Sequence, residues 1–457
     1  MEASSVGRCS HRRKQPNAPK ASMHLIEPIL HQMSSMAKPQ RKFMFILLTA
    51  MTYLPGRVNF RNLGRYTSLN EKTFSRWFRR PFDFVTFNLL SLKGLPDNGE
   101  WVAAIDASFS PKSGRTSYGL DWFWNGSQGQ AERGLEISLL ALVDVTHNTA
   151  YTLSAYQTPA LPKAPKAPEA PKVAKESAAN TEDKIAQDAD KKIKTKATKT
   201  PKETRTTRID IYLDHVKRDT KRLLGKIRYL VADSFYAKTK FINGVVEHGM
   251  HVVSKLRHDA DLRWLYTGEQ KAKGRPRQYA GKVCFDDLSR FELAGDIDGQ
   301  HVYTAVVNAP TFKCNVRIVY VVREEKGKTY TALLFCTDID CAAMDILRYY
   351  KARFQIEFVF RDAKQYTGLC DCQATSEAKL GFHFNASLTA LNLLRLEDRH
   401  HAVEGAGRNV ISIASWKTRK FNAHLLERFS CHLGLDFTAI KSSPGFAALC
   451  NYGAIAA

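Results

Sequence analysis

The segment WVAAIDASFS, residues 101–110, is a run of small and branched apolar residues that carries a carboxylate, Asp106, near its end. A short apolar run bounded by turn-forming segments predicts a buried β-strand. The segment RYLVADSFYAK, residues 228–238, repeats this pattern and carries Asp233. We therefore predict two buried strands, each with an acidic residue at or near its end.

The segments around these two strands predict the rest of a mixed sheet. RTSYGLDWFWNG (115–126) and GLEISLLALVDVTHNTAYTLSAYQT (134–158) predict a three-stranded antiparallel meander with the first strand. Residues 209–227 and 241–249 have helical patterns, and MHVVSKLR (250–257) reads as another buried strand. Alternation of helix and strand predicts that this part of the sheet is parallel.

Shifts in composition divide the chain into segments. Pro159 to Thr207 is rich in Ala, Pro and Lys and has no aromatic residue, which predicts a flexible excursion with no folded core. The predicted organisation is a disordered basic tail (1–22), a helical DNA-binding domain (23–95), the first part of the core (96–158), the disordered insertion (159–208), the second part of the core (209–258), a β-rich insertion (259–340), a core helix carrying an acid (341–375) and a helical C-terminal region (376–457).

The charge of the chain points to its partner. The 457 residues carry a net charge of +23, which no single tail supplies. Such a charge favours a polyanionic partner, above all nucleic acid, over an acidic membrane. The longest apolar run, Phe43 to Leu54, is too short to span a bilayer. The nine scattered cysteines, among which only Cys370 and Cys372 are close, indicate reduced cytoplasmic thiols and no zinc site.

A basic amphipathic helix is predicted near the N-terminus. Ser68 and Glu71 have the spacing of a capping box before KTFSRWFRR. A short helical stretch, NFRNLGRYT, precedes it, so the pair has the pattern of a helix-turn-helix. A basic helix without any DNA contact would look the same. The apolar face would hold Phe74, Trp77 and Phe78, and the basic face, the candidate DNA contact, Lys72, Arg76 and Arg79.

The segment RYYKARFQIEFVFRDAKQ, residues 348–365, predicts one helix with a chemically mixed stripe. Tyr350, Arg353, Glu357 and Lys364 fall within roughly 60° around its axis. A carboxylate flanked by cations suits the grip of an anionic polymer beside a metal ion, although a salt-bridged surface helix would look similar.

Three acids occupy informative places in this order of elements. Asp106 and Asp233 lie on neighbouring strands and Glu357 on a covering helix, so the three could converge. Clustered carboxylates bind hard divalent cations, and two Mg²⁺ ions about 3.5–4 Å apart can clamp the attacking and leaving oxygens at a phosphorus atom. Asp121, Asp144 and Asp214 compete with these acids on grounds of burial.

The order of elements resembles the ribonuclease-H-like core of DDE transposases. The spacing Tyr350-x2-Arg353-x3-Glu357-x6-Lys364 resembles the YREK signature of a large bacterial insertion-sequence transposase family, in which a β-rich insertion before the Glu is also typical. The resemblance covers roughly residues 95 to 430. It implies an α/β fold: a ribonuclease-H-like mixed sheet flanked by helices, with a β-rich insertion and helical N- and C-terminal regions.

The resemblance also implies roles for the residues. Asp106, Asp233 and Glu357 would hold two Mg²⁺ ions, for which Mn²⁺ can substitute. Tyr350, Arg353 and Lys364 would contact the phosphates of the transposon end. In the β-rich insertion, Trp264 would stack on an extruded base, or be an ordinary core residue. Arg275 and Arg277 in GRPRQY would contact the DNA backbone, or form a plain basic hairpin.

The function implied is that of a transposase in the bacterial cytoplasm, associated with the nucleoid. It would cleave the terminal inverted repeats of its element and join the 3′-hydroxyl ends to target DNA, acting as a homodimer when DNA is bound. Two alternatives stay open: a nuclease of the same core that does not join strands, and a DNA-binding regulator that has lost the chemistry.

Overall fold

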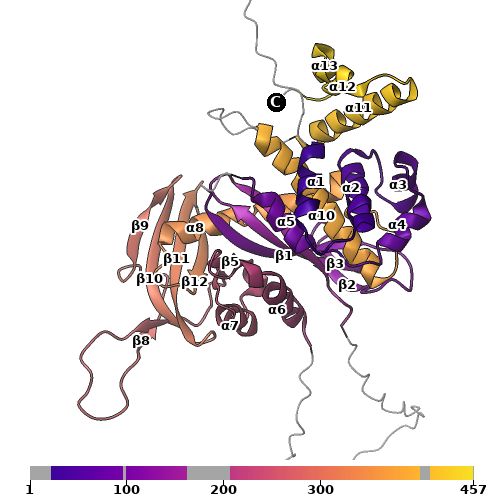
Figure 1. Cartoon of the computed structure of the whole chain (residues 1–457). Coiled ribbons are helices and arrows are strands. Elements are labelled where there is room, and N and C mark those ends of the chain that lie inside the picture. The colour runs from indigo at the N-terminus through magenta and orange to yellow at the C-terminus, as the bar shows by residue number, and fades with distance from the viewer. Residues whose placement is uncertain (1–21, 96–98, 162–205, 402–411, 456–457) are drawn as a thin grey trace, which may run out of the picture.

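The computed structural model describes residues 22–95, 99–161, 206–401 and 412–455. In these residues a mixed sheet of 12 strands runs through the molecule, with helices packed along it (Figure 1). The strand order is β2-β3-β1-β5-β6-β12-β11-β10-β7-β8, with β4 beside β3 and β9 beside β10. This mixed, helix-flanked sheet confirms the predicted fold class. The predicted disordered segments fall mostly on residues 1–21 and 162–205, outside the described residues.

The core half of the sheet has both parallel and antiparallel pairs. β1 is antiparallel to β3 and parallel to β5, and β5 is parallel to β6, so the predicted parallel part is confirmed. Its elements are β1 (Trp101–Pro111), β2 (Asp121–Asn125), β3 (Gln130–Asp144), β4 (Thr149–Gln157), α6 (Arg208–Asp219), β5 (Tyr229–Val231), α7 (Thr239–Glu247) and β6 (His251–Leu256).

The predicted three-stranded meander is wrong, because the segment 134–158 contains two strands. The chain turns between β3 and β4, where Asn148 has a φ of 51°. This left-handed conformation is tolerated by Asn better than by most residues, since its short polar side chain can bond locally. Asn148, in the polar stretch THNT, is therefore the sequence feature that marks this turn.

The β-rich insertion extends the core sheet. β12 pairs antiparallel with β6, from Leu333 opposite Leu256 to Cys336 opposite Val253. The insertion therefore continues the hydrogen-bonded ladder of the core and leaves no free edge at β6. Its strands are β7 (Arg263–Leu265), β8 (Tyr279–Lys282), β9 (Glu292–Ile297), β10 (Gln300–Ala309), β11 (Cys314–Glu325) and β12 (Lys328–Cys336).

The N-terminal helices share a hydrophobic core with α10 (Glu377–His401), the long C-terminal helix. Phe382 and Leu393 of α10 lie in one buried cluster with Phe43 and Leu47 of α2. The N-terminal region is thus packed against α10. Its helices are α1 (Ser22–Gln32), α2 (Lys38–Tyr53), α3 (Phe60–Tyr66), α4 (Glu71–Trp77) and α5 (Phe84–Leu92).

The predicted N-cap of α4 is wrong by two residues. Asn70, not Ser68, is the N-cap, and its side chain accepts a hydrogen bond of 2.9 Å from the backbone N–H of Thr73. Asn is among the preferred N-cap residues, and it stands immediately before the first helical residue.

The predicted single helix over 348–365 is also wrong. Two helices, α8 (Ala343–Ala352) and α9 (Gln355–Tyr366), meet at Arg353 and Phe354. At the junction the N–H of Phe354 bonds to the carbonyl of Lys351, and the N–H of Glu357 to that of Phe354. These i to i−3 bonds tighten the chain into a 3₁₀-like turn, which breaks the α-helical ladder. The C-terminal helices α11 (Ile413–His432), α12 (Phe437–Ser442) and α13 (Pro444–Cys450) follow α10.

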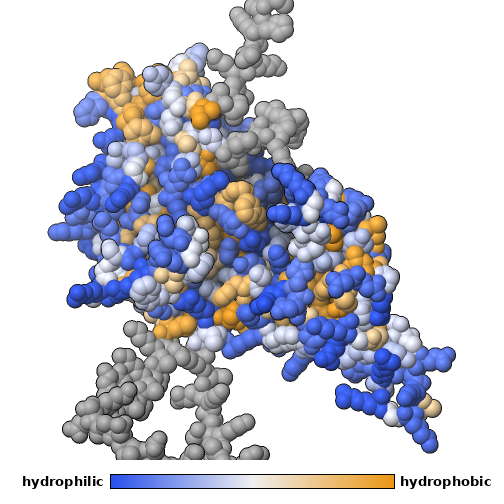
Figure 2. Space-filling view, turned by 180° about the vertical axis from the view of Figure 1, so that it is seen from behind, coloured by the Kyte–Doolittle hydropathy of each residue, from blue (hydrophilic) through white to orange (hydrophobic). Residues whose placement is uncertain are grey.

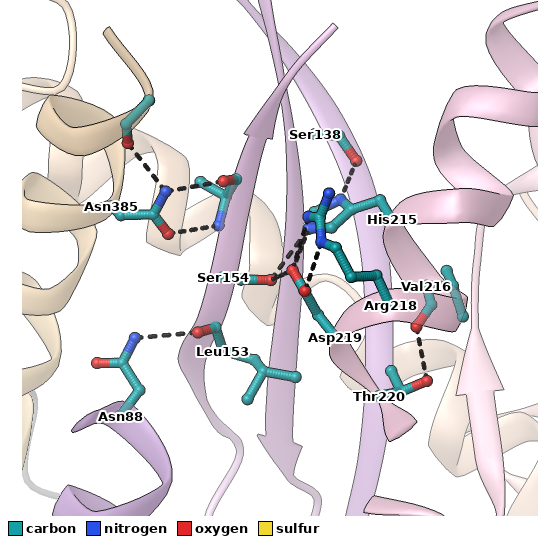
Figure 3. A network of polar contacts seen from close by, with 12 residues as sticks. Asn88, Ser138, Leu153, Ser154, His215, Val216, Arg218, Asp219, Thr220 and Asn385 are labelled. Atoms are coloured by element: carbon teal, nitrogen blue, oxygen red, sulfur yellow. Dashed lines mark hydrogen bonds and ion pairs between the residues drawn. The ribbon is translucent and has the colours of Figure 1, made fainter. Parts of the chain in front are cut away.

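Asparagine side chains from the helices complete the outer edge of β4. Asn385 of α10 exchanges two hydrogen bonds, of 2.9 and 2.8 Å, with the backbone of Ala155, and Asn392 makes the same pair with Thr152. Asn88 of α5 donates to the carbonyl of Leu153 (Figure 3). Because a side-chain amide offers the same donor and acceptor as a peptide group, these residues stand in for the missing neighbouring strand.

A buried Ser–His–Asp cluster joins α6 to the other face of β3 and β4 (Figure 3). The ring of His215 lies 2.9 Å from Ser138 Oγ and 3.0 Å from Ser154 Oγ, and Ser154 donates to Asp219. Burial lowers the pKa of His215. Burial opposes ionisation of Asp219, but hydrogen bonds from Arg218 and His215 more than offset it and lower the pKa of that carboxyl. Both serines and His215 are closed to solvent, so the cluster fastens a helix to the sheet.

Within the residues that the structure describes, every helix is too short or too polar to cross a membrane.

Candidate active site

The two strand acids stand at the same level of neighbouring parallel strands. Ala103 of β1 lies opposite Leu230 of β5, and Ala104 lies opposite Val231. The same register continued for two residues brings Asp106 level with Asp233. Asp106 stands in the middle of β1 and Asp233 two residues after the end of β5, so this register brings both acids to the same level of the sheet.

Backbone contacts fix both acids. Asp106 Oδ1 accepts a hydrogen bond of 2.8 Å from the N–H of Ala107. Asp233 Oδ1 accepts one of 2.8 Å from the N–H of Phe235 and so caps a single 3₁₀ turn, η2 (Ser234–Tyr236). Ser254 of β6 donates to the backbone carbonyl of Asp233. The local sequence therefore holds each carboxylate in one orientation before any ligand arrives.

Helix α9 brings Glu357 to the same edge through Arg353. One guanidinium nitrogen of Arg353, Nη2, lies 3.1 Å from Glu357 Oε1, and the other, Nη1, lies 3.7 Å from Asp106 Oδ2. The guanidinium also lies 5.7 Å from the ring centroid of Tyr350. Although the predicted single helix is broken, its Tyr, Arg and Glu still gather around the strand acids.

Lys364 anchors the far end of α9 to β1. Its Nζ donates hydrogen bonds of 2.8 Å to Ser108 Oγ and to the backbone carbonyl of Phe109. Burial lowers the pKa of its ammonium group. The fourth residue of the spaced pattern thus holds the helix against the strand that carries Asp106.

The electrostatic balance of the site shows in Asp106. The pKa of its carboxyl is raised to about 7, chiefly by burial. The N–H of Ala107 and the guanidinium of Arg353 lower this pKa, whereas the negative charges of Asp233 and Glu357 raise it. Three carboxyl groups thus act on one another in a partly buried place. At neutral pH the site is short of positive charge.

Two buried polar groups beside these acids have no hydrogen-bond partner among the described residues. They are the hydroxyl of Tyr236 and the Nε of Arg353. Tyr236 is 1% exposed, and burial raises its pKa, with Asp106 and Asp233 adding to the effect. The sequence reading missed this tyrosine, although it stands three residues after Asp233 in VADSFY.

These features fit a hydrated divalent cation. Carboxylate oxygens are the ligands that Mg²⁺ and Mn²⁺ prefer, and bound waters could serve the orphaned hydroxyl. In the described part of the chain no three His, Cys, Asp or Glu side chains lie close enough together to hold a metal ion as they stand. Arg353 lies between Asp106 and Glu357, so a shared cation would require that ion pair to open.

A cleft of about 530 Å³ opens beside the acids. Its walls come from β1, the turn after β2, and α9, and it is lined by Asp106, Ser108, Ser127, Glu357, Arg361 and Lys364, among others. The competing acids lie elsewhere. Asp144 pairs with Trp101 at the opposite end of β1 and bonds to His147. Asp121 and Asp214 do not line the cleft, and neither does Asp233, which is assigned to the site by its level with Asp106 in the sheet.

The predicted contacts on α4 lie on the surface. Lys72, Arg76 and Arg79 are exposed, whereas Phe74 and Phe78 are buried beneath them. Lys72 and Arg76 border a second cleft, of about 900 Å³, between α3, α4 and the segment after α9.

The residues predicted in the β-rich insertion divide into two groups. Trp264 is 8% exposed, lies 5.2 Å from the ring of Phe291, and is covered by the guanidinium of Arg290 at 4.3 Å. Arg290 and Phe291 cover the ring, which favours the alternative interpretation as a core residue. Arg275 and Arg277 are exposed on the long loop between β7 and β8, which projects from the body (Figure 1) and is hydrophilic (Figure 2, lower right).

Comparisons with known proteins bear on the same region. Residues 86–294 match the model of a family described as DDE superfamily endonuclease. The match includes Asp106 and Asp233 and ends before Glu357. Curated proteins give no match. With the mixed sheet, the family match supports a metal-dependent enzyme of the nuclease or transposase type that acts on DNA. Over residues 86–294 the chain is thus similar to the DDE superfamily endonucleases.

Proposed function

We propose that this protein is a DNA transposase of the YREK-signature family, which cuts the ends of its insertion sequence and joins the 3′-hydroxyl ends to target DNA. The observation that carries the proposal is the gathering of Asp106, Glu357 and Arg353 at the edge of the sheet where Asp233 stands level with Asp106. The net charge of +23 supplies the attraction to DNA.

Asp106, Asp233 and Glu357 would hold two Mg²⁺ ions, for which Mn²⁺ can substitute. When bound, such ions activate the attacking water or 3′-hydroxyl and stabilise the leaving oxygen. The chain itself fixes Asp106 and Asp233 through backbone N–H groups and steers Glu357 through Arg353. Lys364 keeps α9 seated on β1.

Tyr350, Arg353 and Lys364 would contact the phosphates of the transposon end. In the free protein Arg353 is engaged by two carboxylates. A guanidinium can bind two oxygens of a phosphate group through parallel hydrogen bonds, and Arg353 would make this contact if its pairs with Asp106 and Glu357 opened. Arg353 would thus pair with the carboxylates of the site and also contact the DNA phosphate.

Three exposed basic surfaces would position the duplex. Lys72 and Arg76 on α4 and Arg79 just after it form the first, Arg361 at the mouth of the cleft the second, and Arg275 and Arg277 on the β7–β8 loop the third. Phosphate contacts of this kind set the register of a protein on DNA without reading its sequence.

A transposase that pairs two DNA ends would act as a homodimer, in the bacterial cytoplasm at the nucleoid. Support for self-association comes from exposed apolar side chains on α11 and at its C-cap, where Leu425, Phe429 and Leu433 recur at intervals of four residues. Figure 2 shows apolar residues gathered over the C-terminal helices, at the upper left.

The test is cleavage of a plasmid that carries the DNA flanking this gene, with Mg²⁺. Wild type should release the element and yield strand-transfer products, whereas Glu357→Gln should bind the DNA and cut nothing. Glu325→Gln, which removes an exposed carboxylate from a surface pair on β11, is the matched control. Cutting by Glu357→Gln would contradict the proposed site, and cutting without joined products would identify a nuclease.

A further inference from the structure

Two tryptophans lie exposed on the same face of β2. Trp122 is 62% exposed and Trp124 is 64% exposed, whereas Phe123 between them is 1% exposed. Successive side chains of a strand point to opposite faces, so the two indoles share one face. Tryptophan is highly buried on average in folded proteins, and two exposed neighbours therefore indicate a use for the surface.

The exposed indoles are displayed on a fixed backbone. All five residues of β2 pair with β3. On the buried side, Arg208 of α6 donates a hydrogen bond of 2.7 Å to the carbonyl of Trp122, and its guanidinium lies 4.4 Å from the ring centroid of Phe123. Exposure of the indoles thus does not come from a frayed segment.

One cation stands beside the indoles, and their hairpin adjoins the cleft. Across the ladder Trp122 lies opposite Arg133, and Trp124 lies opposite Ala131; both partners are exposed. No carboxylate is among these four residues. The turn that follows β2 carries Ser127, which lines the cleft with Asp106. A ligand that runs out of the cleft along this hairpin meets aromatic rings and a guanidinium.

We propose that Trp122 and Trp124 form a stacking site for unpaired bases of a DNA strand whose phosphate lies in the cleft. This inference rests on the proposed function. Each base has a flat π face, so stacking on indoles needs no particular sequence. Residues two apart on a strand are about 6.8 Å apart, twice the base-stacking distance, which leaves room for one base between the rings. Arg133 would hold the adjoining phosphate.

The test compares two DNA probes on the full chain at fixed salt: a blunt 20-base-pair duplex, and the same duplex with a five-nucleotide 3′ overhang. The variants are Trp122→Ala with Trp124→Ala, the same pair changed to Phe, and Tyr330→Ala. Tyr330 is an exposed aromatic of β12, in the β-rich insertion, and serves as the control. Affinity is measured by fluorescence anisotropy of the labelled DNA, and the melting temperature of each variant is recorded.

The double Ala variant should bind the overhang probe at least about ten-fold more weakly than wild type does. Its affinity for the blunt probe should be unchanged. The double Phe variant should keep most of the affinity, because its rings still stack, and Tyr330→Ala should behave as wild type. Equal losses on both probes, or none, would overturn the stacking site while leaving DNA cleavage intact. Unchanged DNA binding with lost self-association would show a protein contact instead. Failure of wild type to bind either probe would overturn both proposals.

Discussion

The guanidinium of Arg353 lies 3.7 Å from the carboxylate of Asp106, although one residue ends α8 and the other stands in the middle of β1. The same guanidinium holds Glu357 at 3.1 Å. One cation therefore opposes the repulsion between two acids that would otherwise face each other across a partly buried site. In the metal-free protein this is the positive charge that keeps the acids together.

The raised pKa of Asp106 predicts a stability that depends on pH and metal. Because the folded-state pKa, about 7, lies above the ordinary value, the folded protein favours the protonated carboxyl. That contribution is full below about pH 4 and is lost as the pH rises through about 7. At pH 8 without metal, Asp106→Asn should therefore raise the free energy of unfolding, by at most about 4 kcal/mol.

The measurement is thermal melting at pH 8 with a chelator and with Mg²⁺. Wild type should gain several degrees when Mg²⁺ is added, whereas Asp106→Asn should start higher and respond little. A variant that melts lower than wild type in the chelator and gains as much from Mg²⁺ would contradict the assignment of Asp106 to the site.

Arg353 should set the pH at which the site accepts a metal. Its charge opposes the rise in the pKa of Asp106, so Arg353→Gln should raise that pKa further. Metal binds the ionised carboxylate, and the pH midpoint of Mg²⁺-induced stabilisation should move upward by roughly half a unit or more. Arg348→Gln, which removes an exposed cation that pairs with Glu100 and Asp345 away from the cleft, should leave the midpoint in place. Equal shifts in the two variants would indicate a general charge effect and not a contact.

The strand acids could be predicted from the sequence because their signals are local. An apolar run followed by a carboxylate marks both acids, although β1 continues to Pro111, beyond Asp106, and β5 ends before Asp233. The parallel register then places Asp106 level with Asp233. The spacing of Tyr350, Arg353 and Glu357 also named residues that come together. The same spacing wrongly predicted a single helix, because no Pro or Gly marks the 3₁₀-like turn at Phe354 in the sequence.

Other features depend on pairing between distant segments. Nothing in the sequence of β12 says that it joins β6 and so merges the insertion with the core sheet. Tyr236 acquires its buried, unpaired hydroxyl only from the packing around it. The sequence around Trp264 does not distinguish a buried tryptophan from an exposed one. Only the fold shows that Arg290 and Phe291 cover its ring.

Lys364 should act first as a structural tie between α9 and β1. Lys364→Met keeps the aliphatic stem but removes the hydrogen bonds to Ser108 and to the carbonyl of Phe109. We expect a loss of about 1–3 kcal/mol in stability, since the donor is charged, measured by thermal melting. Lys351→Met, on an exposed position of α8, is the control. The salt dependence of DNA binding tests the other role: a phosphate contact would reduce its slope by about one in Lys364→Met, in line with the proposed function.

The asparagines of α10 should stabilise β4 as a neighbouring strand would. Asn392→Ala leaves the N–H and the carbonyl of Thr152 without partners in a buried place, and each unpaired group costs about 1–3 kcal/mol. A lower melting temperature and faster amide exchange at Thr152 are therefore expected. Asn422→Ala, whose half-buried amide only donates to two carbonyls at the end of α13, should cost less and leave β4 protected. If exchange at Thr152 stays slow in Asn392→Ala, another group closes this edge. Protection lost there, and unchanged in Asn422→Ala, would show that a helix side chain completes the sheet on the side opposite the buried His215 cluster.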